Sequence, residues 1–322
     1  MKQVMIYGTL GPSCADRATL ERMFSEGLCG MRLNLSHTTL EDAAPLIERC
    51  RDAANACGTD CTLLIDLTGP EQRIGALPSP LRLEAGTEIE PDRILLPDAV
   101  RAALTDGRKL LLDDGKILLK VQNNRLQVLR GGVLESRKSV AVCGVSLPSP
   151  VLTETDRRHI RMAKRYGVTG VMQPFVRSAQ DLKEVRAALF EAGADDLRLF
   201  AKVENLDGLN RLDELIPHCD EIVIARGDLG NAMPLWELPA AQKRIAAACR
   251  AAGRDFTVVT QMLDSMTHRP VPTRAEVSDV FNAVLDGAAS VMVTGETATG
   301  DYPVEVIRYR VNTVREALEF QA

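Results

Sequence analysis

Short apolar segments of strand length alternate with amphipathic helical segments along most of this 322-residue chain. Alternating strands and helices build parallel sheets that are covered by helices. The pattern therefore predicts an α/β fold made of eight βα units. The eight strands are expected to begin near Val4, Gly30, Cys61, Thr169, Leu197, Glu221, Phe256 and Ser290.

The helical segments have an apolar face at the spacing of an amphipathic helix. One of them carries signals at both ends, because Thr273 and Glu276 form a capping box and Gly287 follows the last apolar position. The helices are expected at about residues 17–25, 40–56, 155–166, 179–191, 208–216, 239–252, 273–286 and 303–318.

One interval breaks this alternation, because no helical periodicity follows the third strand until about residue 148. Short alternating runs divided by Gly, Asp, Asn and Pro occur there instead, which is typical of a small β module. The runs span residues 81–83, 88–90, 109–112, 117–121 and 126–129.

Eight βα units can close into a barrel of the TIM type, whose chemistry lies at the carboxyl ends of its strands. An insert that leaves from such an end hangs over the mouth of the barrel and is a candidate lid. We therefore predict a (β/α)8 barrel with a small β-barrel-like lid inserted after strand 3. The barrel is expected at residues 1–69 and 146–322, and the lid at residues 70–145.

Charge and composition narrow the possible partners. The formal net charge is −5, and no cluster of Lys and Arg offers a cationic surface for nucleic acid or an anionic membrane. No apolar run approaches the roughly 20 residues of a membrane span, and Met1 leads into a strand without a signal-peptide pattern. The eight cysteines show no CxxC pair and no zinc spacing, and the interval between Cys57 and Cys61 is interpreted as coincidence. We expect a cytoplasmic enzyme with reduced thiols.

Polar side chains interrupt strands that should be apolar throughout. In the second strand, Arg32, Asn34 and Ser36 alternate and so share one face. In the fifth strand, Lys202 and Glu204 share a face in the same way. Unpartnered polar atoms at such positions cost roughly 1–3 kcal/mol each, so these side chains need a ligand or a hydrogen-bond network. A purely structural network, or an internal salt bridge, remains the alternative.

The sixth strand ends in a Gly227-Asp228 turn, which adds a second carboxylate to that of Glu204. Two carboxylates with few nitrogen or sulfur donors suit a hard cation such as Mg²⁺. Backbone N–H groups at a turn that opens a helix also attract an anion. The pattern indicates a site for a metal ion and an anionic substrate.

An ordered set of motifs spanning nearly the whole chain resembles the pyruvate kinase family. The resemblance implies a phosphotransferase of glycolysis that moves the phosphoryl group of phosphoenolpyruvate to ADP, giving pyruvate and ATP. Motifs in the insert, Asp113-Asp114-Gly115 and Gly131-Gly132-x-Leu134, resemble the family's mobile lid domain. The barrel motifs are Gly11-Pro12-Ser13, Met31-Arg32-Leu33-Asn34-Leu35-Ser36-His37, Asp66-x-x-Gly69-Pro70-Glu71-x-Arg73, Lys202-Val203-Glu204-Asn205, Ala225-Arg226-Gly227-Asp228-Leu229-Gly230, Thr260-Gln261-Met262-Leu263, Pro272-Thr273-Arg274-Ala275-Glu276 and Gly295-Glu296-Thr297.

The same resemblance implies roles for individual residues. Lys202, Thr260 and Arg32 match the catalytic positions, where Lys202 lies over the transferring phosphoryl group and Thr260 helps to deliver a proton to the enolate. Substrate binding falls to Arg32, Lys202, Gly227, Asp228 and Thr260, and nucleotide binding to Asn34, His37, Arg73 and Lys138. The implied ligands are Glu204 and Asp228 for Mg²⁺ or Mn²⁺, and Asn34, Ser36, Asp66 and the Leu67 carbonyl for K⁺. Glu71 is similar to the residue found in family members that require K⁺.

Three departures from the family pattern bear on function. The chain stops after the eighth barrel helix, so the C-terminal domain with its allosteric site is expected to be absent, and a homodimer through the barrel helix at 273–286 is expected. The insert is shorter than the family's lid, which puts lid closure in question. Five motif positions are substituted, and their effect on substrate preference stays open: Thr68, Ala141, Cys143, Pro174 and Thr294.

Two other hypotheses remain open. A lyase or aldolase acting on a pyruvate-like acid needs the same Lys202, Glu204 and Asp228, but it has no nucleotide for Arg73 and Lys138 to hold. A catalytically silent paralogue that binds phosphoenolpyruvate or a protein partner would not need intact catalytic positions.

Overall fold

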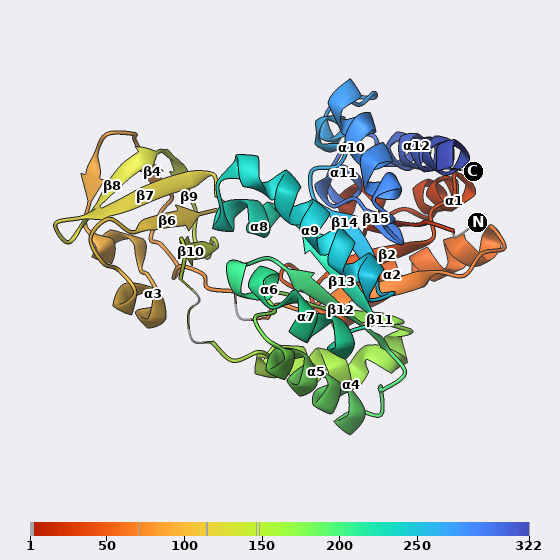
Figure 1. Cartoon of the computed structure of the whole chain (residues 1–322), viewed down its shortest axis with the longest axis horizontal. Helices are drawn as coiled ribbons and strands as arrows, with labels where there is room; N and C mark the ends of the chain where they lie inside the picture. The colour runs from red at the N-terminus through yellow and green to blue at the C-terminus, as the bar shows by residue number, and fades with distance from the viewer. Residues whose placement is uncertain (1–2, 70, 114, 146, 148, 322) are drawn as a thin grey trace.

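The computed structural model describes residues 3–69, 71–113, 115–145, 147 and 149–321 (Figure 1). Pro70 and Asp114, which belong to two of the motifs, lie outside the described residues. Eight parallel strands close into a barrel in the order β1-β15-β14-β13-β12-β11-β3-β2. These strands are β1 (Met5–Thr9), β2 (Gly30–Asn34), β3 (Thr62–Asp66), β11 (Gly170–Gln173), β12 (Arg198–Val203), β13 (Glu221–Ala225), β14 (Asp255–Val259) and β15 (Ser290–Met292).

All eight predicted barrel strands are confirmed, each beginning within one residue of the expected position. Inside the barrel, Tyr7, Leu64, Met172 and Phe200 pack with other buried side chains into a closed core, so the barrel is filled rather than open. A larger apolar core lies between the strands and the surrounding helices. Chemistry is therefore confined to the rim, where the strands end.

Helices surround the barrel, as the periodicity predicted (Figure 1). The capping box of Thr273 and Glu276 and the positive φ of Gly287 are both present at α10. The α-helices of the barrel are α1 (Arg17–Ser25), α2 (Leu40–Ala56), α4 (Glu154–Met162), α5 (Ala179–Glu191), α6 (Leu206–Asn210), α7 (Leu212–Leu215), α8 (Arg226–Ala232), α9 (Leu238–Ala251), α10 (Arg274–Leu285), α11 (Gly295–Ala298) and α12 (Pro303–Gln321). The short 3-10 helices are η1 (Pro12–Cys14), η3 (Ala163–Tyr166), η4 (Ile216–His218), η5 (Leu235–Glu237) and η6 (Asp264–Thr267).

Two predicted helices are wrong as single elements. Residues 155–166 divide into α4 and η3, and residues 208–216 divide into α6, α7 and η4. The side chain of Asn205 accepts a hydrogen bond from the Gly208 N–H at 2.8 Å and so starts α6 earlier than expected. The chain leaves helical geometry at Arg211, whose N–H closes α6 onto the Asp207 and Gly208 carbonyls. The apolar periodicity of the sequence continues across this break, so the sequence pattern did not reveal it.

In the described residues of the insert between β3 and α4, seven strands surround an apolar core of their own. Five of them form an antiparallel sheet in the order β10-β6-β7-β8-β5, and two pair as β4-β9. The sequence predicted the first five strands of the insert but neither the last two nor its helical turns. The elements are β4 (Leu81–Leu83), β5 (Glu88–Ile89), η2 (Pro91–Ile94), α3 (Asp98–Ala102), β6 (Lys109–Leu112), β7 (Ile117–Gln122), β8 (Arg125–Arg130), β9 (Gly132–Leu134) and β10 (Val140–Val142).

The insert, called the lid below, stands beside α8 at one end of the barrel (Figure 1). Gly115, in the turn between β6 and β7, touches α8 so closely that a Cβ there would collide with the side chain of Asn231. Its positive φ of 82° is a further reason for glycine at this position. Within the described ranges, no helix has the length and apolar content needed to cross a lipid bilayer.

Candidate active site

Four charged side chains meet at the carboxyl ends of β2, β3 and β12. Asp66, which ends β3, accepts hydrogen bonds from Arg32 at 2.6 and 2.8 Å and from Lys202 at 3.0 and 3.2 Å. Lys202 also pairs with Glu204, with 2.9 Å between Nζ and Oε1. The parallel pairing of β2 with β3 places Asn34 opposite Asp66. The predicted polar face of β2 and that of the fifth barrel strand therefore meet in one continuous ion-pair chain, which we call the rim cluster: Arg32, Asp66, Lys202 and Glu204.

The rim cluster holds its charges although it is nearly sealed from water. Asp66 is 2% exposed, and such burial by itself would raise its pKa. The neighbouring Lys202 ammonium and Arg32 guanidinium outweigh burial, so the pKa of Asp66 lies below its usual range. Burial would lower the pKa of Lys202, but the carboxylates of Asp66 and Glu204 raise it. Asp66 and Lys202 are therefore both charged around neutral pH.

A strained loop residue fixes the far oxygen of Glu204. The backbone N–H of Phe175 donates to Glu204 Oε2 at 2.7 Å. Phe175 has a positive φ of 52°, which is an unfavourable conformation for a residue with a side chain. Such strained conformations are often found at functional sites, and here the strained residue is the one whose N–H binds the carboxylate. Both Glu204 oxygens thus have partners that hold the carboxylate in one orientation.

A cavity of about 200 Å³ opens above the rim cluster. It brings together most of the site residues predicted from the sequence, from segments far apart in the chain. The predicted residues that line it are Arg32, Asn34, Ser36, His37, Asp66, Leu67, Arg73, Lys138, Lys202, Glu204 and Asp228. The predicted K⁺ ligands Asn34, Ser36, Asp66 and Leu67 are all in this group.

Gly227 and Thr260 do not line this cavity, although both were predicted to bind substrate. The two residues lie against each other, since a Cβ on Gly227 would come within 3.1 Å of Thr260 Cγ2. Gly227 directly precedes Asp228, which does line the cavity. Thr260 has a φ of 80°, and its carbonyl accepts hydrogen bonds from Arg226 at 2.7 and 3.2 Å. Arg226 also pairs with Asp279 at 2.7 Å, so it holds this strained turn in place. Arg226 belongs to one of the barrel motifs, but the motif by itself predicts no role for it.

The lid contributes a second group of charges to the same cavity. Lys138 lies 3.0 Å from Asp113, and Arg73 pairs with Glu71 at 2.5 Å and donates to the Arg137 carbonyl at 3.0 Å. The hydrogen bond to Asp113 raises the pKa of Lys138. We call Arg73, Lys138 and Asp113 the lid charges. Lys138 and Arg73 are each about one third exposed, so these pairs are wetter than the rim cluster.

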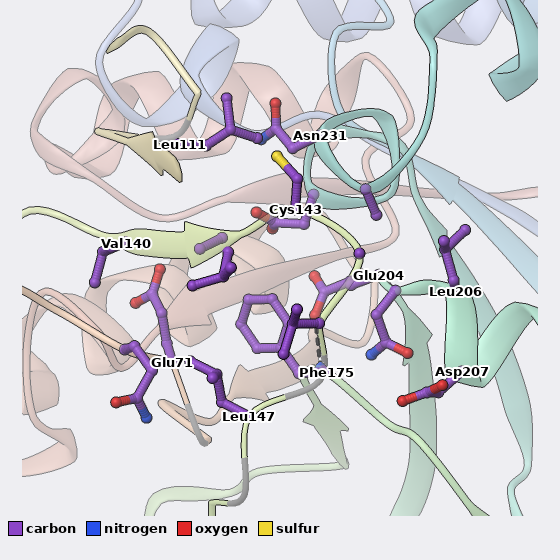
Figure 2. A pocket seen from close by; sticks show the side chains of 18 of the residues that line it. Glu71, Leu111, Val140, Cys143, Leu147, Phe175, Glu204, Leu206, Asp207 and Asn231 are labelled. Carbon is purple, nitrogen blue, oxygen red and sulfur yellow. Dashed lines mark hydrogen bonds between the residues drawn. The ribbon is translucent and has the colours of Figure 1, made fainter. Parts of the chain in front are cut away.

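A larger cavity of about 400 Å³ continues the site between the lid and the barrel (Figure 2). It shares Glu71, Ser139, Phe175, Glu204 and Asp228 with the smaller cavity. Figure 2 shows the Phe175 ring among side chains of both domains, with Glu204 beside it. Leu111 and Val140 of the lid and the neighbouring Leu147 face this space together with the Cys143 thiol. Two of the departures from the family pattern, Ala141 and Cys143, therefore lie on the lid wall of this cavity.

The junction between the insert and the barrel, called the hinge below, is held by one carboxylate that the sequence analysis missed. Asp156, at the start of α4, accepts hydrogen bonds from the N–H groups of Thr68 at 2.8 Å and Gly69 at 3.1 Å, where the chain enters the lid. It also accepts from the Thr153 N–H at 2.9 Å, just after the chain has returned. The spacing Thr153-x-x-Asp156 of its capping box is a signal that the sequence did contain.

The donor set at the rim fits a hard divalent cation. Glu204 and Asp228 line the same cavity and offer carboxylate oxygens, the ligands that Mg²⁺ prefers. Within the described part of the chain, no group of three or more His, Cys, Asp or Glu side chains is arranged to hold a metal ion by itself. Mg²⁺ is commonly bound by one or two carboxylates together with substrate oxygens and water, so two protein ligands suffice for such a site.

Comparison with known proteins identifies the lineage of this site. A family model described as "Pyruvate kinase, barrel domain" matches residues 1–307. The chain belongs to the pyruvate kinase family. It is 35% identical to a pyruvate kinase of Bacillus licheniformis over 99% of this chain and 58% of that protein, and 37% identical to one of Aeropyrum pernix over 95% of this chain and 69% of that protein. It is also 37% identical to human pyruvate kinase PKLR, over 98% of this chain and 60% of that protein.

The resemblance seen in the motifs is thus confirmed, and so is the barrel fold that it implied. The chain spans a little more than half the length of some of the curated relatives it matches, at 58% of the Bacillus licheniformis protein and 55% of a pyruvate kinase of Geobacillus stearothermophilus. Pyruvate kinases as a family depend on metal ions, which agrees with the two carboxylates at the rim.

Proposed function

We propose that this chain transfers the phosphoryl group of phosphoenolpyruvate to ADP, giving pyruvate and ATP, with Mg²⁺ or Mn²⁺ and K⁺ as cofactors. One observation carries the proposal. The rim cluster and the lid charges line a single cavity, so a phosphoryl donor on the barrel and a nucleotide beneath the lid would meet there.

The electrostatics of the cavity suit this reaction. Phosphoryl transfer offers little covalent chemistry to a protein, so the rate depends on cations fixed around the transferring group. Arg32 and Lys202 supply two positive charges that Asp66 holds in place, and a guanidinium fork suits phosphate oxygens. When bound at Glu204 and Asp228, the divalent ion supplies further positive charge at the substrate oxygens. Asn34, Ser36, Asp66 and the Leu67 carbonyl are proposed to hold K⁺.

The bond changes follow from these positions. The bond between the enol oxygen and phosphorus breaks, and a β-phosphate oxygen of ADP forms the new bond to phosphorus. Lys202 stabilises the negative charge that remains on the enolate oxygen. A proton then reaches the enolate carbon from the side of Thr260, whose turn is fixed by Arg226. We propose that residues 70–145 close over this step as a lid and exclude water.

The nucleotide is proposed to bind between the rim and the lid. Arg73 and Lys138 extend into the cavity from the lid side, and Asn34 and His37 extend into it from the barrel side. This arrangement supports a kinase rather than a lyase, because a lyase has no use for two cations directed at nucleotide phosphates.

Two further properties belong to this proposal. The capped helix α10 is proposed to lie at the contact between two copies of the chain in a homodimer, and a monomeric mass in solution would contradict that. A cytoplasmic location stays a prediction of the sequence.

The test is pyruvate formation from phosphoenolpyruvate and ADP in the presence of Mg²⁺ and K⁺. The Lys202→Met variant serves as the inactive reference, and Lys183→Met, at an exposed position on α5, is the matched control. We expect turnover by the unaltered chain and by Lys183→Met, with a large loss in Lys202→Met. Equal rates in all three proteins, or no turnover in any, would contradict the proposal.

A further inference from the structure

Two cysteines that are distant from the active-site cavities face each other at the other end of β3. Cys50 belongs to α2, and Cys61 directly precedes β3. Their sulfur atoms lie 3.4 Å apart. A disulfide bond has a sulfur–sulfur distance of about 2.05 Å, so the two atoms need to approach by a little over 1 Å to form one.

The two thiols differ in access. Cys50 is buried at 1% exposure, whereas Cys61 is partly exposed. The contact between the two thiols lowers the pKa of Cys61, and the same contact together with burial raises the pKa of Cys50. Cys61 is therefore the thiol with more thiolate character, and it is also the one that a solute can reach.

Cys57, the cysteine closest to Cys61 in the sequence, has different partners. Cys57 Sγ lies 3.4 Å from the Ser25 hydroxyl and 3.3 Å from the Glu21 carbonyl, so it faces α1 and not Cys61. Cys14, Cys219 and Cys249 are buried, and burial raises the pKa of each thiol. The geometry thus marks one pair among the eight cysteines for joint chemistry.

We propose that Cys50 and Cys61 form a two-thiol oxidation site, which a peroxide converts into a reversible disulfide. In the first step the Cys61 thiolate attacks a peroxide oxygen. A sulfur–oxygen bond forms, the oxygen–oxygen bond breaks, and the peroxide is reduced to water or an alcohol as Cys61 becomes a sulfenic acid. In the second step Cys50 attacks the Cys61 sulfur, the sulfur–oxygen bond breaks, and one water leaves with the thiol proton.

Cys50 protects Cys61 from further oxidation in this scheme. A sulfenic acid without a nearby thiol continues to sulfinic acid, which most reductants do not reverse. With a second sulfur in contact, the disulfide forms first, and it closes the short loop between α2 and β3. The bond lies at the start of β3, whereas Asp66 lies at its end, so this site is separate from the proposed phosphotransfer.

The test exposes the full-length reduced protein to hydrogen peroxide, alkylates the remaining thiols with iodoacetamide, and counts them by intact mass. We expect the loss of two alkylatable thiols, their return after dithiothreitol, and a cross-link between peptides containing Cys50 and Cys61. Cys57→Ser is the matched control and should form the same cross-link.

The two single variants separate the roles of the thiols. Cys61→Ser should form no disulfide at this site, and Cys50→Ser should carry sulfinic acid on Cys61 after the same treatment. A wild-type chain whose Cys61 is oxidised to sulfinic acid without pairing, or whose cross-link joins Cys57 instead of Cys50, would overturn the proposal. These wild-type outcomes do not depend on whether either variant folds.

Discussion

The rim cluster and the lid charges both place charged side chains at the same cavity, but the side chains of the rim cluster are more firmly fixed than those of the lid. In the rim cluster, Asp66 and Lys202 have side-chain exposures of 2% and 12% and share several short hydrogen bonds. Among the lid charges, Lys138 is 31% exposed and pairs with Asp113 at 3.0 Å, while Glu135 lies 3.4 Å away. Buried, multiply bonded ions keep their positions, whereas exposed pairs exchange partners readily.

This difference assigns a different task to each side. Charges that stabilise a transition state act best when they need no rearrangement during the reaction, which describes the rim cluster. Charges that admit and release a nucleotide need to exchange partners, which describes the lid charges. The comparison predicts that rim substitutions lower kcat and that lid substitutions raise KM.

The largest effect is expected for Glu204→Gln. This change removes a proposed metal ligand and the partner of Lys202, so kcat for pyruvate formation should fall by about 10²–10³-fold. Glu221→Gln is the matched control, because Glu221 is an equally buried strand carboxylate at the opposite end of the barrel, bonded to Ser290 at 2.9 Å. The control is expected to lose stability while the folded enzyme keeps its kcat. Similar losses of kcat in both variants would break the comparison.

Asp156→Asn tests whether the hinge positions the lid charges relative to the rim cluster. Loss of the charge weakens the hydrogen bonds from Thr68 and Gly69, where the chain enters the lid, and from Thr153, where it returns. The unfolding free energy should fall by about 1.5–3 kcal/mol. The KM for ADP should rise, and limited proteolysis should cut the lid boundary faster. Glu276→Gln is the control, because Glu276 caps α10 in the same way but does not touch the hinge. If only stability changed in Asp156→Asn, with KM for ADP unaltered, its role at the hinge would be purely structural.

A smaller effect is expected on the lid itself. Lys138→Ala should raise the KM for ADP by up to about fivefold with kcat nearly unchanged, since an exposed ion pair is worth about 1 kcal/mol at most. Lys116→Ala is the control, because Lys116 pairs with the same Asp113 at 3.1 Å but does not line either cavity. Equal changes in the two variants would mean that the pair with Asp113, and not contact with the nucleotide, sets KM.

The smallest effect concerns acid stability. The pKa of Asp66 is lower in the folded chain than the ordinary value of about 3.9, so its contribution is fully present above that value and is lost as the pH falls through the folded pKa. Urea unfolding between pH 5 and pH 2 should show a steeper loss of stability in the unaltered chain than in Asp66→Asn. Parallel curves would show that Asp66 is not stabilised in its charged form.

The sequence predicted the parts of the site that depend on local pattern. Polar residues at alternating positions in apolar strands revealed Arg32, Lys202 and Glu204, and the barrel strands followed from their spacing. The ion pair between Asp66 and Lys202 could not be predicted from local pattern, because the two residues are 136 positions apart and are brought together only by the register of the barrel strands. The contact of Cys50 with Cys61 and the bond from Phe175 to Glu204 depend on tertiary packing in the same way.

The sequence near the hinge contains a helix-capping signal from which the hinge contacts were not predicted. The capping box at Thr153 and Asp156 is as clear in the sequence as the one at Thr273 and Glu276. Only the structure shows that the Asp156 carboxylate also accepts hydrogen bonds from Thr68 and Gly69. Local pattern predicts that a helix begins there, and tertiary packing decides what else the capping carboxylate binds.

The central claim is that the rim cluster and the lid charges serve one transfer reaction between two ligands. Phosphorus NMR of the chain with phosphoenolpyruvate, ADP, Mg²⁺ and K⁺ tests this most directly, because it follows the phosphoryl group itself. We predict that the phosphoenolpyruvate signal is replaced by the γ-phosphate signal of ATP, with one ATP formed for each pyruvate. Release of inorganic phosphate without ATP, or an unchanged phosphoenolpyruvate signal, would contradict the account.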